Sequence, residues 1–342
     1  MKKLGLLILV LTLLVSGCGV NNQVSNKIDS DLKSEIKKSL PAYKVAFASV
    51  NKKGGSDIWI ADVDGSNEKQ LTSGDGQDIY PEWSSNGEFV YYTGNKHGGA
   101  LELYRVNSKG EPKPVQLSMF GKEVRSISLS KDNSMIALGI MSTNVPMGAD
   151  LKDYSADLFV LKMEVLDKAL ASNQMVTLED LELILSEPEE KHIWHEQPCF
   201  QKTDEENPYI AYVRTENYDN DPIMKDAVYL VKADGSDNME LLSQGSMPQW
   251  TFDDKHVVTH EFMIYDLASK TQKKLKIDGL SGDAGSPSIS PDGKYVIFES
   301  SDRKRLAGVS KVVLEGDKTE NPIVVFSKRP VFEPRWSPVP IE

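Results

Sequence analysis

Ionisable side chains and one indole gather in a single short stretch of the sequence, residues 187–199. The acidic, imidazole and indole side chains of this stretch are Glu187, Glu189, Glu190, His192, Trp194, His195 and Glu196. Imidazole and carboxylate groups together can bind a metal ion or a polar ligand, and an indole ring can stack on a ligand. The alternative is an acidic, solvated loop with one or two surface histidines. His195 and Trp194 are the candidate ligand-binding residues here.

Two aspartates elsewhere in the chain are candidates for the same site. Asp78 lies five residues before Trp83, just as His195 lies five residues before Phe200, and Asp283 precedes a further copy of this pattern. Equivalent positions of a repeat occupy equivalent places in space. We therefore predict that Asp78, His195 and Asp283 surround one acidic mouth of a central channel. A divalent cation such as calcium, or a basic patch on a partner, would suit that mouth, unless these charges are simply scattered over the surface.

Signatures of catalysis are scarce. His195-Glu196 and His260-Glu261 each lack the second histidine of a zinc-protease helix. The sequence has no Gly-x-Ser-x-Gly elbow and no phosphate-binding Gly-Lys-Ser/Thr loop. A prolyl-oligopeptidase-like peptidase is therefore not expected, and we predict that the protein is not an enzyme.

The N-terminus has the pattern of an exported protein. Lys2 and Lys3 precede an unbroken apolar run from Leu4 to Val15. At ~1.5 Å per residue this run is too short for a bilayer core of ~30 Å, which is typical of a secretory signal peptide. Val15-Ser16-Gly17-Cys18 follows at once and resembles the lipobox of bacterial lipoproteins. An ordinary signal peptide with an unrelated cysteine is the alternative.

The resemblance to a lipobox implies cleavage before Cys18 and lipidation of its thiol. We therefore predict a signal peptide over residues 1–17 and a lipidated, flexible polar tether over residues 18–42, with a short helix near 31–39. Acyl chains such as palmitate would anchor the protein to the extracytoplasmic face of the cell membrane.

Composition narrows the class of protein further. The formal net charge is −12, apolar residues make up 39% and charged residues 26%, as in ordinary soluble globular proteins. An acidic chain lacks the basic face that a phosphate backbone requires, so we expect no nucleic-acid partner. Cys18 and Cys199 are the two cysteines, and they leave no disulfide framework. We expect Cys199 to be a buried apolar residue and the protein to be a monomer.

A Pro-x-aromatic pattern, followed by Ser or Thr, a turn and a strand, recurs along the chain. Its aromatic or aliphatic anchors are Trp83, Leu129, Phe200, Trp250, Ile289 and Trp336. Most anchors are about 40–50 residues apart, which is the period of a four-stranded propeller blade. The longer interval between Leu129 and Phe200 predicts an insertion, with a strand over 156–165, a helix over 166–172 and an outer strand over 181–185.

These copies resemble the TolB-type propeller repeat, with its P-x-W-S-P-D-G and I-Y-V-x-D-x-D-G-x-x-x-x-L-T signatures. The closest matches are residues 57–72, 80–93 and 286–298, and the resemblance covers about 43–338. It implies a six-bladed β-propeller over residues 43–342. The first unit lacks its Pro-x-Trp strand, and the last copy, at 334–338, lacks a following strand. We therefore predict that the C-terminal strand completes the first blade and closes the ring, which removes exposed sheet edges.

Fold and N-terminus together predict a membrane-anchored extracytoplasmic lipoprotein with an all-β, non-catalytic TolB-like β-propeller. Its predicted role is to bind an envelope protein or cell-wall component at one rim of the channel, although such propellers serve several functions. The alternative is a metal-assisted enzyme that acts on polysaccharide in the channel. The sequence has five histidines, two of them in one loop, which disfavours a metal site built from several blades.

Overall fold

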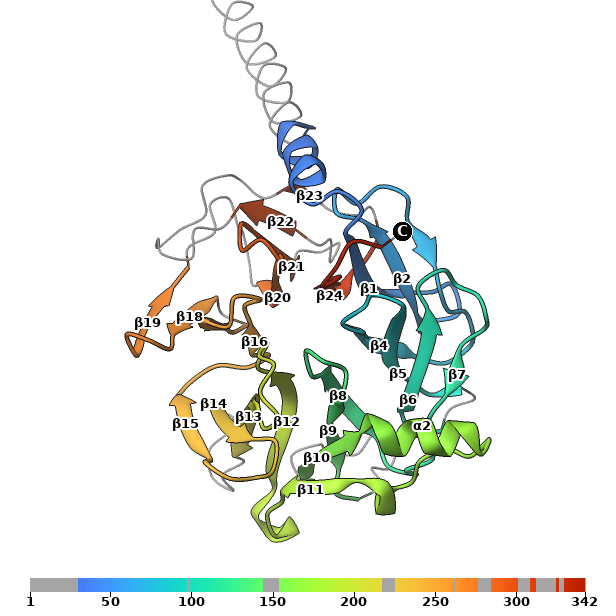
Figure 1. Ribbon diagram of the computed structural model, residues 1–342, viewed down its shortest axis with the longest axis vertical. Coiled ribbons are helices and arrows are strands. Elements are labelled where there is room, and N and C mark those ends of the chain that lie inside the picture. Colours follow the sequence, from blue (N-terminus) through green and yellow to red (C-terminus); the bar gives the residue numbers. More distant parts are fainter. Residues whose placement is uncertain are drawn as a thin grey trace, which may run out of the picture.

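The computed structural model describes residues 30–96, 99–143, 154–216, 225–260, 262–275, 284–300, 308–311, 324–325 and 329–341. The predicted signal peptide, Cys18 and Asp283 lie outside these residues. Regular structure in the described part is almost entirely β-strand, so the all-β prediction is confirmed. The sheets are arranged around a common centre (Figure 1).

The strands form four four-stranded sheets and one eight-stranded sheet, which divide into six units of four strands. Unit 1 contains β24 (Phe332–Trp336), β1 (Lys44–Val50), β2 (Ser56–Asp62) and β3 (Lys69–Gln70). Unit 2 contains β4 (Asp78–Trp83), β5 (Phe89–Gly94), β6 (Glu102–Asn107) and β7 (Val115–Gln116). Unit 3 contains β8 (Val124–Leu129), β9 (Met135–Met141), β10 (Ala156–Lys162) and β11 (Glu182–Leu185).

The other three units follow in chain order. Unit 4 contains β12 (Ile193–Phe200), β13 (Tyr209–Glu216), β14 (Lys225–Lys232) and β15 (Met239–Leu242). Unit 5 contains β16 (Gln249–Trp250), β17 (His256–Val258), β18 (Met263–Asp266) and β19 (Thr271–Lys274). Unit 6 contains β20 (Ala284–Ile289), β21 (Tyr295–Ser300), β22 (Gly308–Lys311) and β23 (Val324–Val325). A single parallel pairing, Ala156 with Trp194, joins units 3 and 4 into the eight-stranded sheet.

The strands β4, β8, β12, β16, β20 and β24 lie nearest the centre and are called the inner strands here (Figure 1). Each ends on one of the six anchors, and every anchor is buried. A hydroxyl then begins the turn to the next strand. Ser84, Ser130, Thr251 and Ser290 each donate to the Asn or Asp two residues later, at 2.6–2.8 Å. The same oxygens accept the backbone N–H five residues later, so the repeated Ser/Thr fixes the hairpin.

The two ends of the described chain meet in unit 1. Strand β24 pairs antiparallel with β1, with Val45 opposite Trp336 and Ala48 opposite Phe332. The Trp336 indole N–H donates to the Ser288 carbonyl of unit 6 at 2.8 Å. The Trp83 indole N–H of unit 2 donates to the Arg335 carbonyl at 3.1 Å. Strand β24 therefore connects units 6, 1 and 2.

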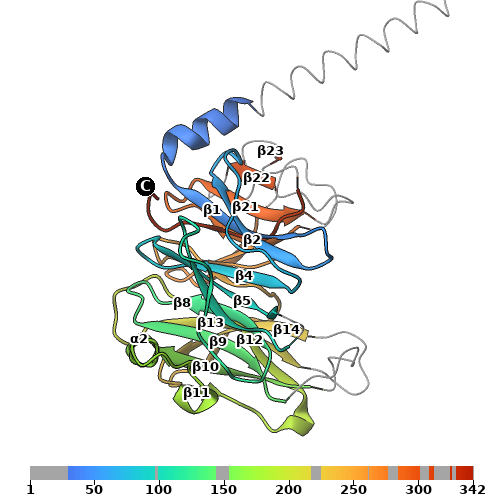
Figure 2. The ribbon, with the colours of Figure 1, turned by 90° about the vertical axis from the view of Figure 1, so that its right-hand side faces the viewer.

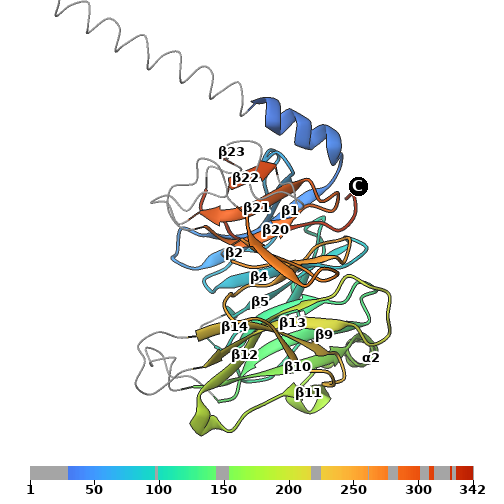
Figure 3. The same cartoon turned by 90° about the vertical axis from the view of Figure 1, so that its left-hand side faces the viewer.

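The predicted insertion lies in unit 3. Helix α2 (Met163–Ala171) follows β10 directly and buries Leu166, and the short 3₁₀ helices η3 (Leu178–Asp180) and η4 (Glu189–Lys191) flank β11. Figures 2 and 3 show the ring from its two edges, with α2 at one end and the N-terminal helix at the other. The predicted helix begins three residues too late, because the strand is shorter than expected.

The N-terminal helix, residues 30–39, is packed against the ring. Leu32, Ile36 and Leu40 recur every four residues and are buried on one face. They join the core that units 1 and 6 share, with Val45, Phe47, Ala61, Val63, Tyr295, Ile297, Val331 and Trp336. The Ser39 hydroxyl also donates to Asp292 of unit 6 at 2.8 Å. The short helix predicted near 31–39 is therefore present, but it packs on the junction of units 1 and 6 instead of lying in a flexible tether.

Among the described residues, no helix combines the length and the apolarity needed to cross a bilayer.

Replacing Ile36 with Ala should test whether the helix stabilises the ring. The side chain is buried at the junction, so we expect the free energy of unfolding to fall by about 2–5 kcal/mol. The exposed Ser34→Ala on the same helix is the matched control and should change little. Chemical denaturation of both variants measures the difference. Equal stabilities would mean that the helix does not hold units 1 and 6 together.

Candidate functional site

Asp78, which the sequence predicted at a channel mouth, is only 5% exposed. It is the first residue of β4, and its carboxyl group lies over β5, where a Cβ on Gly94 would come within 2.6 Å of its Oδ1 atom. Its backbone carbonyl accepts the Ser56 hydroxyl of unit 1 at 3.0 Å. Burial between units 1 and 2 raises its pKa to about 6, and the negative charge of Asp57 adds to the effect. Asp78 is therefore an interface residue between two units.

His195 and Trp194 are buried as well. The His195 ring lies 5.6 Å from the Tyr212 ring between centroids, and burial together with the Arg214 charge lowers its pKa to about 4. Trp194 packs on Met141 and Ala156, and its indole N–H donates to the Tyr154 carbonyl at 2.6 Å. Both side chains are only 3% exposed, and Asp283 lies outside the described residues.

The described residues give no support to the metal site that the sequence suggested. Within the described ranges, no group of three or more His, Cys, Asp or Glu side chains could hold a metal ion. The acidic stretch 187–196 forms η4 and the start of β12, where Glu187 pairs with Lys191 at 2.7 Å.

Five of the six anchors are preceded, three residues earlier, by a residue with an unusual backbone conformation. At this position φ is between +47° and +55° in Tyr80, Gln197, Met247, Ser286 and Glu333. Each of these residues precedes a proline, and β-bulges interrupt the pairing of β4, β12 and β20 here. Proline is tolerated at a bulge because no ladder hydrogen bond needs its missing N–H. The proline of the repeated motif thus marks a bulge in the inner strand.

These bulges bring neighbouring units together around the centre. The N–H of Tyr80 donates to Glu333 Oε2 at 2.7 Å, and the N–H of Gln197 donates to Ser126 Oγ at 2.8 Å. The N–H of Met247 donates to Gln197 Oε1 at 2.6 Å. In each case a side chain of one unit binds the backbone at the same repeat position of the next unit. The cavity between these residues, called the waist, measures only about 40 Å³.

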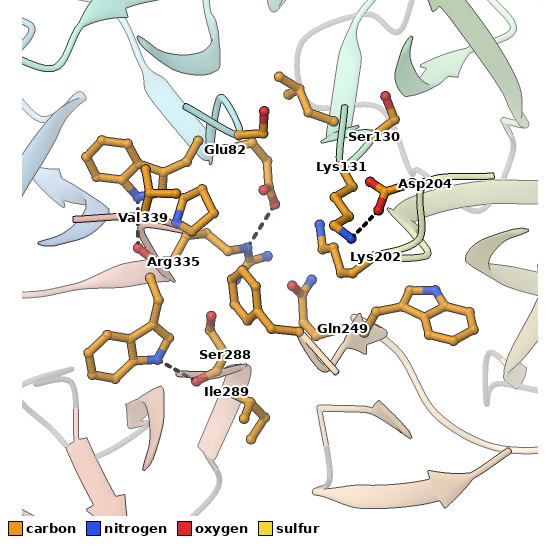
Figure 4. Close-up of a pocket in the computed structure, with 17 residues that line it drawn as sticks. Glu82, Ser130, Lys131, Lys202, Asp204, Gln249, Ser288, Ile289, Arg335 and Val339 are labelled. Atoms are coloured by element: carbon orange, nitrogen blue, oxygen red, sulfur yellow. Dashed lines mark hydrogen bonds and ion pairs between the residues drawn. The ribbon is translucent and has the colours of Figure 1, made fainter. Parts of the chain in front are cut away.

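A larger cavity of about 320 Å³ opens beside the waist (Figure 4). This cavity, called the funnel, is lined by side chains from segments 82–85, 129–131, 202–204, 249–252, 288–289 and 335–339, so all six units contribute. Glu82, Gln249 and Arg335 line both cavities and form the floor of the funnel. Because the waist measures only about 40 Å³, it has room for a few waters but not for a polypeptide, so the funnel is closed to a polypeptide at that end.

The funnel combines apolar walls with paired charges. The walls include Trp83, Trp250 and Trp336, which are only 3–5% exposed because their rings lie between the units. At the floor, Arg335 Nε donates to Glu82 Oε1 at 2.9 Å (Figure 4). Elsewhere in the lining, Lys131 forms an ion pair with Asp204 at 2.8 Å. These three tryptophans therefore pack between the units.

Carboxyl groups near the waist have shifted pKa values. Burial raises the pKa of Glu333 to about 8, although Arg335 opposes the shift. Burial raises the pKa of Glu196 to about 7, and the guanidinium of Arg125, 3.7 Å away, opposes this shift. The waist therefore gains negative charge as the pH rises from about 5 to 9.

Sequence reasoning missed the residues that line the funnel floor. Glu82, Gln249 and Arg335 each occupy the x of a Pro-x-Trp copy, and Ser288 occupies the x before Ile289. Side chains alternate along a strand, so a residue next to a buried anchor must point the other way, toward the centre. Alternation around the anchor was the signal that could have identified these residues.

Comparison with known proteins agrees with this geometry. A sequence model of the dipeptidyl peptidase IV (DPP IV) N-terminal region matches residues 25–147. No curated protein matches the chain in sequence. TolB from Acinetobacter baumannii is similar in structure, with a TM-score of 0.59 and 14% identity over 86% of this chain and 66% of the TolB chain.

Two other solved structures show how widely the fold is shared. The hydrazine synthase of Kuenenia stuttgartiensis matches with a TM-score of 0.65 and 14% identity, over 88% of this chain and 48% of that one. An oligogalacturonate lyase in complex with manganese matches with a TM-score of 0.52 and 14% identity, over 81% and 73%. The chain thus spans about two thirds of TolB and about half of the hydrazine synthase. It has a TolB-like β-propeller fold, and at this identity the likeness extends to the fold alone.

The raised pKa of Glu333 predicts a pH-dependent stability. The folded protein holds this proton more tightly than the unfolded chain, so its contribution is complete below about pH 4.5 and is lost as the pH rises through about 8. Glu333→Gln keeps an acceptor for the Tyr80 N–H but cannot ionise. We expect the variant to be more stable than wild type at pH 9, by about 1–3 kcal/mol, and similar at pH 4.5.

Denaturation curves at several pH values measure this difference. The exposed Glu88→Gln is the control and should keep the wild-type pH dependence. Parallel curves for wild type and Glu333→Gln would contradict the assignment of this carboxyl group.

Proposed function

We propose that the protein is a non-catalytic binding module of the cell envelope, and that the funnel is its binding site for a protein partner. The observation that carries this proposal is the funnel itself, because every unit contributes to one closed-ended pocket with apolar walls and a polar floor. Such a pocket has the composition that binding sites usually have.

A protein partner suits the funnel better than a polysaccharide. Sugar rings bind by stacking on exposed aromatic faces, but Trp83, Trp250 and Trp336 are 3–5% exposed. Phe252 is half-buried, so it is more exposed than these three tryptophans. The charged side chains of the Glu82–Arg335 and Lys131–Asp204 ion pairs can also form hydrogen bonds with polar groups at the rim of a protein interface.

We further propose that the six units are the blades of one closed propeller, with β24 as its clasp. The support is the pairing of β24 with β1 and its two indole–carbonyl bonds to the neighbouring units. Closure places Arg335, Trp336 and Val339 in the funnel wall, so the binding site depends on the clasp.

The N-terminal motif supports attachment to the membrane. We propose that Cys18 is lipidated and holds the propeller at the extracytoplasmic face of the cell membrane, through a tether that ends where helix 30–39 begins. Two or more acyl chains make such an anchor stable, whereas one chain binds only marginally.

The substitution Cys18→Ser should release the protein. We expect the variant to move from the membrane to the soluble fraction, with a thermal unfolding midpoint unchanged from that of the released wild-type domain. Fractionation and N-terminal mass spectrometry measure both properties. A mature N-terminus at another residue, without a lipid, would contradict the proposal.

Site-specific photo-crosslinking in cells tests the funnel as the binding site. A photoreactive residue in place of Phe252, inside the funnel, should capture a discrete partner. The same residue in place of Leu183, which is 57% exposed on the outer strand β11, is the matched control and should not. Capture from Leu183 but not from Phe252 would place the binding site elsewhere.

A further inference from the structure

Cations outnumber carboxylates in the funnel, although the whole chain has a formal net charge of −12. The charged residues of its lining are Lys131, Lys202, Arg335, Glu82 and Asp204. Two cations are already paired, Arg335 with Glu82 and Lys131 with Asp204. The ammonium group of Lys202 makes no ion pair with any residue of the described ranges. The lining of the funnel therefore has one more cation than carboxylates, and Lys202 is the cation without an ion pair.

Two hydrogen bonds to Asp254 fix the backbone from which the Lys202 side chain extends. The Lys202 N–H donates to Asp254 Oδ1 at 3.2 Å, and the Gln201 side-chain amide donates to Asp254 Oδ2 at 2.9 Å. In Figure 4 the side chains of Lys131, Lys202 and Arg335 point into the same central space.

One unpaired cation suits an anion with a single charge. A carboxylate is such a group, whereas a phosphate dianion would require a second free cation, and Arg335 is occupied by Glu82 at 2.9 Å. The walls around the charge are apolar, with Leu129, Ile289 and Val339 in addition to the aromatic rings. The complementary ligand is therefore a carboxylate that lies next to an apolar group.

The shape of the funnel distinguishes the end of a polypeptide from its middle. An internal Asp or Glu would bring two lengths of chain, and both would have to pass through the open mouth because the waist, at about 40 Å³, is too small for a polypeptide. A C-terminal residue enters once and carries its carboxylate and its side chain on the same Cα atom. A closed-ended pocket with one cation and apolar walls fits that arrangement.

We propose that the funnel binds the C-terminal residue of a partner protein. Lys202 pairs with the terminal carboxylate, and the apolar walls receive the last side chain. This inference rests on the binding function proposed above and specifies its ligand.

Pools of decapeptides with randomised sequence and a fixed C-terminal Leu or Phe provide the probe. They are prepared as free acids and as C-terminal amides, and retention on the immobilised full-length protein is measured by mass spectrometry. We expect at least tenfold greater retention of the acids. Lys202→Met should abolish this preference and Lys202→Arg should keep most of it. The exposed Lys52→Met, outside the funnel, is the matched control and should behave as wild type.

Two results would overturn the inference while leaving the proposed function intact. One is equal retention of acids and amides, unaffected by Lys202→Met. The other is retention of neither pool while a photoreactive residue at position 252 still captures a partner. Loss of the acid preference in Lys52→Met as well as in Lys202→Met would show a non-specific effect of charge and would also overturn it.

Discussion

The pairing of β24 with β1 is the constraint on which the rest of the structure depends. It joins residues from opposite ends of the chain, Trp336 and Val45, in one sheet. Through the Trp336 and Trp83 indoles the same strand bonds to units 6 and 2. Helix 30–39 then covers this junction with Leu32, Ile36 and Leu40. Contacts of such large sequence separation carry a high entropic cost, and this buried cluster offsets it.

The repeated bulge converts this ring into a pocket with a floor. A non-glycine residue with positive φ costs of the order of 1–3 kcal/mol, and five inner strands adopt it at the same position. The hydrogen bonds from Tyr80, Gln197 and Met247 to the preceding units offset part of that cost. Because these bonds draw the inner strands together at the waist, which measures only about 40 Å³, the funnel beyond it is closed to a polypeptide at that end. The backbone strain at the bulge and the shape of the funnel therefore have the same structural origin.

The sequence allowed the strands, anchors and turns to be predicted because those features depend on local patterns. The Ser or Thr after each anchor and the alternation around Trp83 and Trp250 act over a few residues. The predicted acidic mouth depended instead on regular alternation of side chains along a whole inner strand. The bulge inserts one extra residue, which reverses the alternation for the residues before it. Asp78 and His195 lie before the bulge and are buried, whereas Glu82 lies after it and lines the funnel. The docking of helix 30–39 was also missed, since three apolar residues in a polar segment gave no indication of their partner.

Hydrogen exchange of wild type and Trp336→Ala, followed by mass spectrometry, tests the closed ring most directly. Removing this buried indole should cost about 3–5 kcal/mol. If β24 is the clasp, amides in β1 of unit 1 and in β20 and β21 of unit 6 should lose protection together, and the unfolding midpoint should fall. The exposed Val115→Ala on β7 is the control. Unchanged protection in units 1 and 6, with a midpoint within about 1 °C of wild type, would contradict the account.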